Sequence, residues 1–526
     1  MQKRTLIRGC GMIGITLIAT VFFATPSMAQ ATNSSPAVSG WFSDIQIKLN
    51  GYLRTYLSMN LGNPPETRKN DRWDISMARG ALQLEGSLSK GDIISFYAVA
   101  RAYGEVRTPY LKRLSRLGAG EDESGGNLMD NYQGVDLREF YAAFDLKELG
   151  KWGERVNFRV GKQQIIWGET DFFQAMDLLQ GFDFTWRSFL EGENEDLRKP
   201  LIFVNAVIQI PELNGNLQLV LRPGVDREED IGTTYDLFGG RWANQPNKGV
   251  NFLPLVPYNY EHRSGDIEDP TWGIRWSGAI ANIGYSLAYL RVFGPDPAVN
   301  SAFVPYKSIP KGSLGEFIYP KKDLFGFTAN YAVAPPIDAV FSTEIAYTKD
   351  NFFNVGTDFL GGALPGFGGI KKKDTLRLML RMDKNLYFLK PLTATPFNEE
   401  RSPWFSVQIF DTCILNYKKS DDIVDLAGYG ARKRKHSAII TAILNQSYMS
   451  DRLKPGIAGG YDLSYGGWFI IPSLTYIVGD HWRFNAELDL FFPDNSKRPG
   501  EVESGTHMFG YFKNNNQLFM RATYQF

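Results

Sequence analysis

Residues 159–173 read RVGKQQIIWGETDFF and bring together groups that could do chemistry, namely a Gly-Lys pair, a tryptophan and two carboxylates. A phosphate-binding loop requires the motif Gly-x4-Gly-Lys-Ser/Thr. Here Gly161-Lys162 is followed by Gln163, and the first glycine of the motif is missing. The segment is therefore not predicted to bind a nucleotide, and the elements around it have to explain it.

No other motif in the sequence predicts catalysis. The metalloprotease motif HExxH and paired cysteines are absent, and the four histidines show no metal-ligand spacing. His436 and Ser437 are adjacent, so on a strand their side chains would point to opposite faces. Residues 462–466 read DLSYG and lack the first glycine of the Gly-x-Ser-x-Gly elbow. We expect no enzymatic activity, no metal and no cofactor.

The first residues have the pattern of a secretory signal peptide. A basic start, MQKRTLIRG, runs into an apolar stretch too short to span a bilayer and ends in Pro-Ser-Met-Ala. We predict a signal peptide over 1–29, a short flexible periplasmic lead over 30–44 and one barrel domain over 45–526. Cleavage would leave 54 of the 57 basic residues against 57 acidic ones, a net charge of −3. This nearly neutral balance argues against a nucleic-acid partner.

The last ten residues, QLFMRATYQF, alternate between an apolar and a mostly polar face, as a half-buried strand does. A chain that ends in such a strand with a terminal aromatic residue resembles outer-membrane barrel proteins. Tyr524 and Phe526 are then the predicted membrane-insertion signal, read by the barrel assembly machinery. The alternative is a strand of a soluble sandwich.

The same alternation recurs along the chain, and it favours a membrane barrel. In the segments 45–57, 375–383 and 482–492 the charged residues all fall on one parity. A charge that faces lipid at mid-bilayer costs about 2–4 kcal/mol, so a transmembrane strand must segregate its charges in this way. Aromatic residues make up 14% of the chain, as girdles at the membrane interfaces would require.

Short and long links between the expected strands also alternate. Short links are expected at 89–92, 147–153, 211–214, 281–282, 334–338 and 479–480, and long ones near 59–73, 103–135, 164–200, 223–270, 293–322, 349–373 and 414–435. A barrel with short periplasmic turns and long external loops has this pattern. We predict an all-β fold, a transmembrane antiparallel β-barrel of about 18 strands, with 16 as the alternative. The count depends on how 384–402 and 455–467 are divided.

One long link is predicted to fold into the barrel. The strand alternation breaks over 162–167, and the following residues are more apolar than a solvated loop would be. The large apolar side chains of this link are Phe172, Phe173, Met176, Leu178, Leu179, Phe182, Phe184, Trp186 and Phe189. Folding inward against the barrel wall would bury them, so we expect this segment to constrict or plug the lumen.

Several stretches resemble the outer-membrane proteins of the domain of unknown function 1302 family. They are LREFYAAFDL, RVGKQQIIWGETD, MDLLQGFDF, EDLRKP and NGNLQLVLRPG, within residues 137–224. Residues 180–183 read QGFD where that family usually has Asn-Pro-x-Asp. The resemblance implies a Gram-negative outer-membrane barrel that moves hydrophobic molecules such as steroids, terpenoids or lipids alongside inner-membrane pumps of the resistance-nodulation-division type.

The leading expectation is a channel or transporter for small hydrophobic or amphipathic molecules, gated by segment 167–200. The predicted lumen or constriction residues are Arg159, Lys162, Trp167, Glu169, Asp171, Asp177, Asp183 and Arg187. Each could instead form a structural ion pair or hydrogen bond that pins the loop. The alternative function is a non-conducting partner of a periplasmic carrier or inner-membrane pump. Outer-membrane lipid and lipopolysaccharide are expected to surround the barrel.

Overall fold

A computed structural model describes residues 45–526, apart from 64–66, 68, 92, 117–127, 130–131, 147–149, 151–152, 169, 192–193, 244–247, 262–265, 305–308, 310, 391–400, 427–430 and 495–507. The predicted signal peptide (1–29) and periplasmic lead (30–44) lie outside the described residues. Among the described helices, none is both long and apolar enough to cross a membrane.

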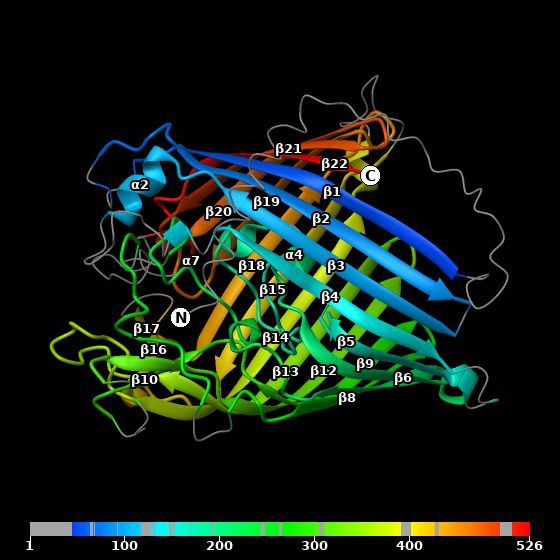
Figure 1. Cartoon of the computed structure of the whole chain (residues 1–526), viewed down its shortest axis with the longest axis horizontal. Helices are drawn as coiled ribbons and strands as arrows, with labels where there is room; N and C mark the ends of the chain where they lie inside the picture. Colours follow the sequence, from blue (N-terminus) through cyan, green and yellow to red (C-terminus); the bar gives the residue numbers. More distant parts are fainter. Residues whose placement is uncertain are drawn as a thin grey trace.

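Eighteen described strands form one closed antiparallel barrel (Figure 1). Each strand pairs with the next barrel strand along the chain, and the last pairs with the first, from Tyr52 opposite Gln525 to Asn60 opposite Gln517. The fold prediction is therefore confirmed, with eighteen strands and not sixteen. The strands are β1 (Ile45–Asn60), β2 (Ile75–Lys90), β3 (Ile94–Glu105), β4 (Gly134–Asp145), β5 (Val156–Gln163), β6 (Leu201–Ile210), β7 (Gly215–Arg222), β8 (Thr271–Ile280), β9 (Ile283–Phe293), β12 (Lys321–Val333), β13 (Ala339–Asn354), β14 (Ile370–Asn385), β15 (Trp404–Ile414), β18 (His436–Asn445), β19 (Leu453–Asp462), β20 (Trp468–Val478), β21 (Trp482–Phe492) and β22 (Gln517–Gln525).

Long links gather at one rim of the barrel and short turns at the other. Two places break the predicted alternation of link length. The link 463–467 is short although it lies at the long-link rim, and 386–403 is long although it lies at the short-turn rim. Both links lie in or beside the stretches on whose division the strand count depended. The length of a link in these stretches does not show at which rim of the barrel it lies.

The two faces of the wall differ as the alternation predicted. Along β1, Tyr52, Arg54 and Tyr56 are buried, while Leu49 on the other parity is 66% exposed. Other large apolar side chains are exposed on the same outer face around the barrel, among them Leu287, Phe325, Phe341, Leu380, Leu474 and Phe484. A continuous apolar outer face suits a membrane and not water.

Smaller elements lie in the long links and help to close the long-link rim. They include the helices α2 (Pro109–Ser115), α4 (Asn194–Leu197) and α7 (Met508–Tyr511) and two short hairpins. The hairpins are β10 (Ala298–Ser301) with β11 (Gly315–Ile318), and β16 (Val424–Asp425) with β17 (Ala431–Arg432). One buried cluster, which includes Trp242 and Phe509 of these links, packs against the segment that enters the barrel.

Candidate functional site: a plug inside the barrel

The link between β5 and β6, residues 164–200, lies inside the barrel, and we call it the plug. Its side chains and backbone form hydrogen bonds or ion pairs with inward-facing residues of nine strands around the wall, namely β1, β3, β4, β7, β13, β14, β15, β21 and β22. Helix α4, which belongs to the plug, is drawn within the outline of the barrel in Figure 1. The predicted inward fold of this segment is confirmed.

The chain leaves the wall for the lumen after Gln163, the last residue of β5. Gly161 has a φ of 134°, and a Cβ there would lie 2.3 Å from the carbonyl oxygen of Phe140 on β4. Only glycine fits this backbone, since L-residues rarely adopt that φ. Trp167 then lies against the inner wall with 1% exposure, and its indole N–H donates to Gln218 Oε1 on β7 at 2.9 Å. The Gly-Lys pair of this segment therefore belongs to the end of a wall strand, where Gly161 permits the close approach of β4.

Arg187 ties the plug to β21. Its guanidinium donates to Asp489 at 3.0 Å and also to Glu487, and it lies 3.6 Å from the centre of the Phe519 ring on β22. The side chains of Arg187 and Asp489 are 2% and 0% exposed. Breaking a buried pair by removing one partner costs about 3–5 kcal/mol, because the other charge stays buried. Arg187 is thus a firm anchor.

Asp196 ties the plug to a nearby part of the wall, on the other side of the β22–β1 junction. It pairs with Arg54 on β1 at 2.8 Å and with Arg101 on β3. Burial would raise the pKa of the Asp196 carboxyl, but the two guanidinium groups together hold that pKa below its ordinary value. Arg138 on β4 donates to the backbone carbonyls of Glu195 and Arg198, both at 2.8 Å. Three wall arginines therefore hold the end of the plug.

Polar and apolar contacts fix the middle of the plug. The backbone N–H of Met176 donates to Glu344 on β13 at 3.0 Å, and Asp171 pairs with Arg381 on β14 at 3.1 Å. The side chain of Met176 fills the space above Gly326 on β12, where an added Cβ would lie 2.0 Å from its terminal carbon. The plug and the wall are therefore complementary in shape here as well as in charge.

Two further plug carboxylates are fully enclosed and paired with arginine. Asp177 pairs with Arg198 within the plug, and Glu191 pairs with Arg521 on β22 at 2.8 Å. Burial raises the pKa of both carboxyls, although the arginines oppose the shift. Burial likewise lowers the pKa of the Lys199 ammonium. These groups lie in a setting with little water.

Aromatic rings fill the space between these ion pairs. Phe173 contacts Phe410 of β15 with ring centres 5.4 Å apart, and Phe189 contacts Phe469 of β20 at 5.6 Å. Trp186 lies 6.0 Å from Tyr56 of β1. Each aromatic pair adds about 0.5–1.5 kcal/mol beyond the area that it buries. Phe519 is an aromatic residue on the mostly polar face of β22. The structure explains its position, because its ring lies beneath the Arg187 guanidinium and beside the Tyr56 ring.

Two other long links cover the plug at the long-link rim. Arg241, in the link 223–270, donates to Glu105 at the end of β3, and Glu105 also accepts from Arg79 on β2. Phe184 in the plug donates its backbone N–H to Thr234 at 2.9 Å. Phe509 in α7 contacts Phe173 and Phe189 of the plug. The plug is thus held by links at the long-link rim as well as by the barrel wall.

The predicted site residues fall into different places. Trp167, Asp171, Asp177 and Arg187 contact the wall or the plug interior as described above. Asp183 accepts from Thr185 within the plug at 2.7 Å, and Lys162 lies 3.5 Å from both Asp136 and Asp230 near the rim. Arg159 is exposed on β5 beside the Tyr141 ring, away from the plug contacts, and Glu169 lies outside the described residues. Their roles in a constriction stay predictions.

The sequence did not reveal the wall partners of these residues. Arg54, Arg381, Glu487 and Asp489 all fell on the inward parity of their predicted strands, so alternation placed them in the lumen. Pairing each with one plug residue requires the closed barrel, since Arg187 and Asp489 are 302 positions apart.

Replacing Asp171 by asparagine is expected to change stability only slightly. The Asp171 side chain is 42% exposed, and an exposed ion pair contributes at most about 1 kcal/mol. The urea midpoint of the folded barrel in detergent should therefore move little, and the N–H donors of Gln408 and Arg381 keep an acceptor in the new amide oxygen. A loss above about 2 kcal/mol would contradict this.

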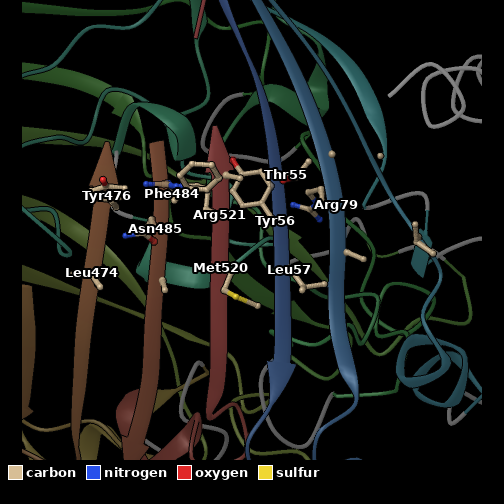
Figure 2. A pocket seen from close by; sticks show the side chains of 16 residues that line it. Thr55, Tyr56, Leu57, Arg79, Leu474, Tyr476, Phe484, Asn485, Met520 and Arg521 are labelled. Carbon is tan, nitrogen blue, oxygen red and sulfur yellow. The ribbon is translucent and has the colours of Figure 1, made fainter. Parts of the chain in front are cut away.

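A separate hollow of about 670 Å³ lies on the wall where β22 meets β1 (Figure 2). Figure 2 labels Leu474, Phe484, Met520 and Leu57, which lie on the outward parity of four neighbouring strands. Small residues such as Ala522 and Gly80 leave the space between them. No plug residue lines this hollow, so it belongs to the membrane side of the wall and not to the lumen.

Comparison with known proteins places the chain in a family. No curated protein matches the sequence. Similar solved structures include OmpF of Salmonella typhi in a complex with daunomycin (8% identity, TM-score 0.40, covering 92% of this chain and 98% of that chain). OccAB1 of Acinetobacter baumannii (11%, 0.43, 93% and 97%) and OpdK of Pseudomonas aeruginosa with vanillate (9%, 0.43, 91% and 98%) are also similar. The family described as "Protein of unknown function (DUF1302)" matches residues 13–395. The chain therefore belongs to the DUF1302 family, as its residues 137–224 suggested.

Proposed function

We propose that the chain is an outer-membrane channel that the plug holds closed, and that small hydrophobic or amphipathic molecules pass through it. The observation that carries the proposal is the plug itself, which is tied to strands around the inner wall of a closed barrel of eighteen described strands. Barrels of 16–18 strands enclose an aqueous channel unless something fills it.

The chemistry of the lumen supports the proposed class of substrate. A path between plug and wall would run past the rings of Phe173, Phe410 and Phe469 and past paired charges such as Asp171 with Arg381. Ligand sites with many aromatic side chains and a few placed polar groups suit molecules that have both characters. The apolar outer face of the barrel supports its place in a membrane.

Planar-bilayer recording of the intact chain and of a plug variant tests the proposal. The intact chain should give small or rare conductance steps, and a variant with residues 170–195 replaced by a short Gly-Ser linker should give larger and more frequent ones. A matched control replaces 357–366 by the same linker, since the described contacts of this outer link are with other outer links. The control should behave as the intact chain does.

One outcome of these recordings would contradict the channel proposal. If neither the intact chain nor the plug variant conducts although both fold as barrels, the channel proposal is wrong, and a non-conducting partner of a carrier or pump takes its place.

A further inference from the structure

The outer face of the barrel carries three polar side chains in contact on neighbouring strands. Cys413 and Asp411 lie on β15 and His436 lies on β18, where Cys413 and His436 are directly opposite in the ladder. The sulfur of Cys413 is 3.7 Å from His436 Nε2, and His436 Nδ1 is 2.7 Å from Asp411 Oδ2. β15 and β18 are neighbours in Figure 1.

These three side chains point away from the lumen. The inward residues of β15 are Ser406, Gln408 and Phe410, which are buried, and Asp411 and Cys413 alternate with Phe410. The His436 side chain is 56% exposed and the Asp411 side chain 22% exposed. Ser437 faces the other way, with its hydroxyl 3.4 Å from that of Tyr465, so the predicted separation of His436 and Ser437 is observed.

The position of the three groups matches the edge of the membrane. Outward aromatic rings of neighbouring strands form a belt in which Tyr289 contacts Phe325 at 5.0 Å and Phe325 contacts Tyr347 at 6.2 Å. Aromatic girdles lie at the membrane interfaces. The ladder continues this row from Tyr347 to Leu376, from Leu376 to Cys413 and from Cys413 to His436. The polar group therefore interrupts the girdle at the long-link rim.

An acyl chain has an apolar surface to follow on the outer face, beyond Asp411. Ile409 and Leu380 lie further down the same outer face and are 39% and 47% exposed. Leu463, 43% exposed, follows the next strand beside Ala438. Lipid ester groups lie at the boundary between hydrocarbon and headgroups, which is the level of the girdle. A lipid held here would bring its ester next to Cys413.

The order of the three groups is that of a nucleophile, a base and an orienting carboxylate. A histidine that donates its Nδ1 proton to Asp411 presents a lone pair at Nε2 to the thiol. Thiolates, and not thiols, attack carbonyl carbon. Loss of the thiol proton to His436 would therefore activate Cys413, and Asp411 would hold the ring in the required tautomer.

We propose that Cys413, His436 and Asp411 form a membrane-facing active site that cleaves acyl esters of amphipathic lipids in the surrounding leaflet. The Cys413 proton moves to His436 Nε2 as sulfur bonds to the ester carbonyl carbon. The carbon–oxygen ester bond then breaks, the leaving alcohol takes the proton from His436, and an acyl thioester remains on Cys413. Water, with His436 again as base, releases the fatty acid and restores the thiol.

This proposal goes beyond channel function and does not depend on it. It also runs against the expectation from sequence motifs that the chain is no enzyme. No local sequence motif contains the group, because its members come from two strands that are separated by the link 415–435.

The first experiment measures activation of the thiol. The full-length folded barrel is treated with iodoacetamide across pH 5–9, and alkylation of Cys413 is followed by mass spectrometry. At neutral pH the wild-type thiol should react much faster than that of His436→Gln, since a positioned base is worth about 10²-fold or more. The alkylation rate of Asp411→Asn should lie between those of the wild type and His436→Gln. His481→Gln is the matched control, since His481 is another exposed histidine, bonded to Gln525 at the opposite rim, and it should behave as wild type.

The second experiment looks for the intermediate and the product. The barrel is reconstituted into vesicles of phosphatidylethanolamine and phosphatidylglycerol, with and without lipopolysaccharide. A hydroxylamine-labile acyl group on Cys413 and released fatty acid are expected. Both should vanish in Cys413→Ala, which should fold and resist heat as wild type does. Equal alkylation of wild type and His436→Gln would overturn the proposal. So would an activated thiol that gains no acyl group and releases no fatty acid in either vesicle.

Discussion

Replacing Arg187 by alanine should lower the free energy of unfolding by about 3–5 kcal/mol. The substitution leaves Asp489 fully buried and Glu487 nearly so, with their charges facing each other and no cation between them. It also removes the cation above the Phe519 ring. The measurement is the urea midpoint of the folded barrel in detergent, and bilayer recording should show more frequent openings because the plug loses its anchor on β21.

Two further variants sharpen this test. Adding Glu487→Gln and Asp489→Asn to the Arg187 variant removes the uncompensated charges, so much of the lost stability should return. Arg159→Ala is the matched control, since Arg159 is exposed on β5, and this substitution should change the free energy of unfolding by less than about 0.5 kcal/mol. An Arg187 variant as stable and as closed as wild type would mean that this ion pair does not hold the plug.

Acidification is expected to loosen the plug through Asp196. Arg54 and Arg101 hold the pKa of its carboxyl below the ordinary 3.8, against the effect of burial. A carboxylate with a lowered pKa stabilises the closed form at pH values above its ordinary pKa, and this contribution is lost as pH falls through the lowered value. Channel openings should therefore rise when the pH falls below 3.8, and Asp196→Asn should open often even at pH 7.

Protonation of the other buried plug carboxylates has the opposite effect on the closed plug. Burial raises the pKa of Asp177 and of Glu191, so each takes up a proton more readily in the closed form than in an open one. Protonation of these two favours the closed plug as the pH falls toward the range of 4–5 in which free carboxyls titrate. On acidification, the frequency of wild-type channel openings should thus first fall and then rise. The Asp196→Asn variant should lack the final rise, and a wild-type record that is flat down to pH 3 would contradict this assignment.

The strand pattern and the inward segment were both readable from the sequence, for different reasons. Charges on one parity predicted each wall strand because a lipid-facing charge is costly, and the eighteen strands follow. The aromatic content of 170–189 predicted burial because so many rings cannot remain in water. The sequence did not show how 386–403 and 463–467 divide into strands and links, because a link of either length can lie at either rim.

By itself, the sequence determined which residues face inward, that the chain forms a barrel, and that the stretch RVGKQQIIWGETDFF turns from the wall into the lumen. These are local properties, since alternation and polarity act over a few neighbouring residues. Only the tertiary structure decided the partners. Closure of the barrel brings β21 and β22 beside β1, and thereby sets Asp489 against Arg187 and Arg54 against Asp196. The pairing of β15 with β18 sets His436 opposite Cys413 on the outer face. Such contacts depend on strand register and on the path of the plug, which no local pattern of residues encodes.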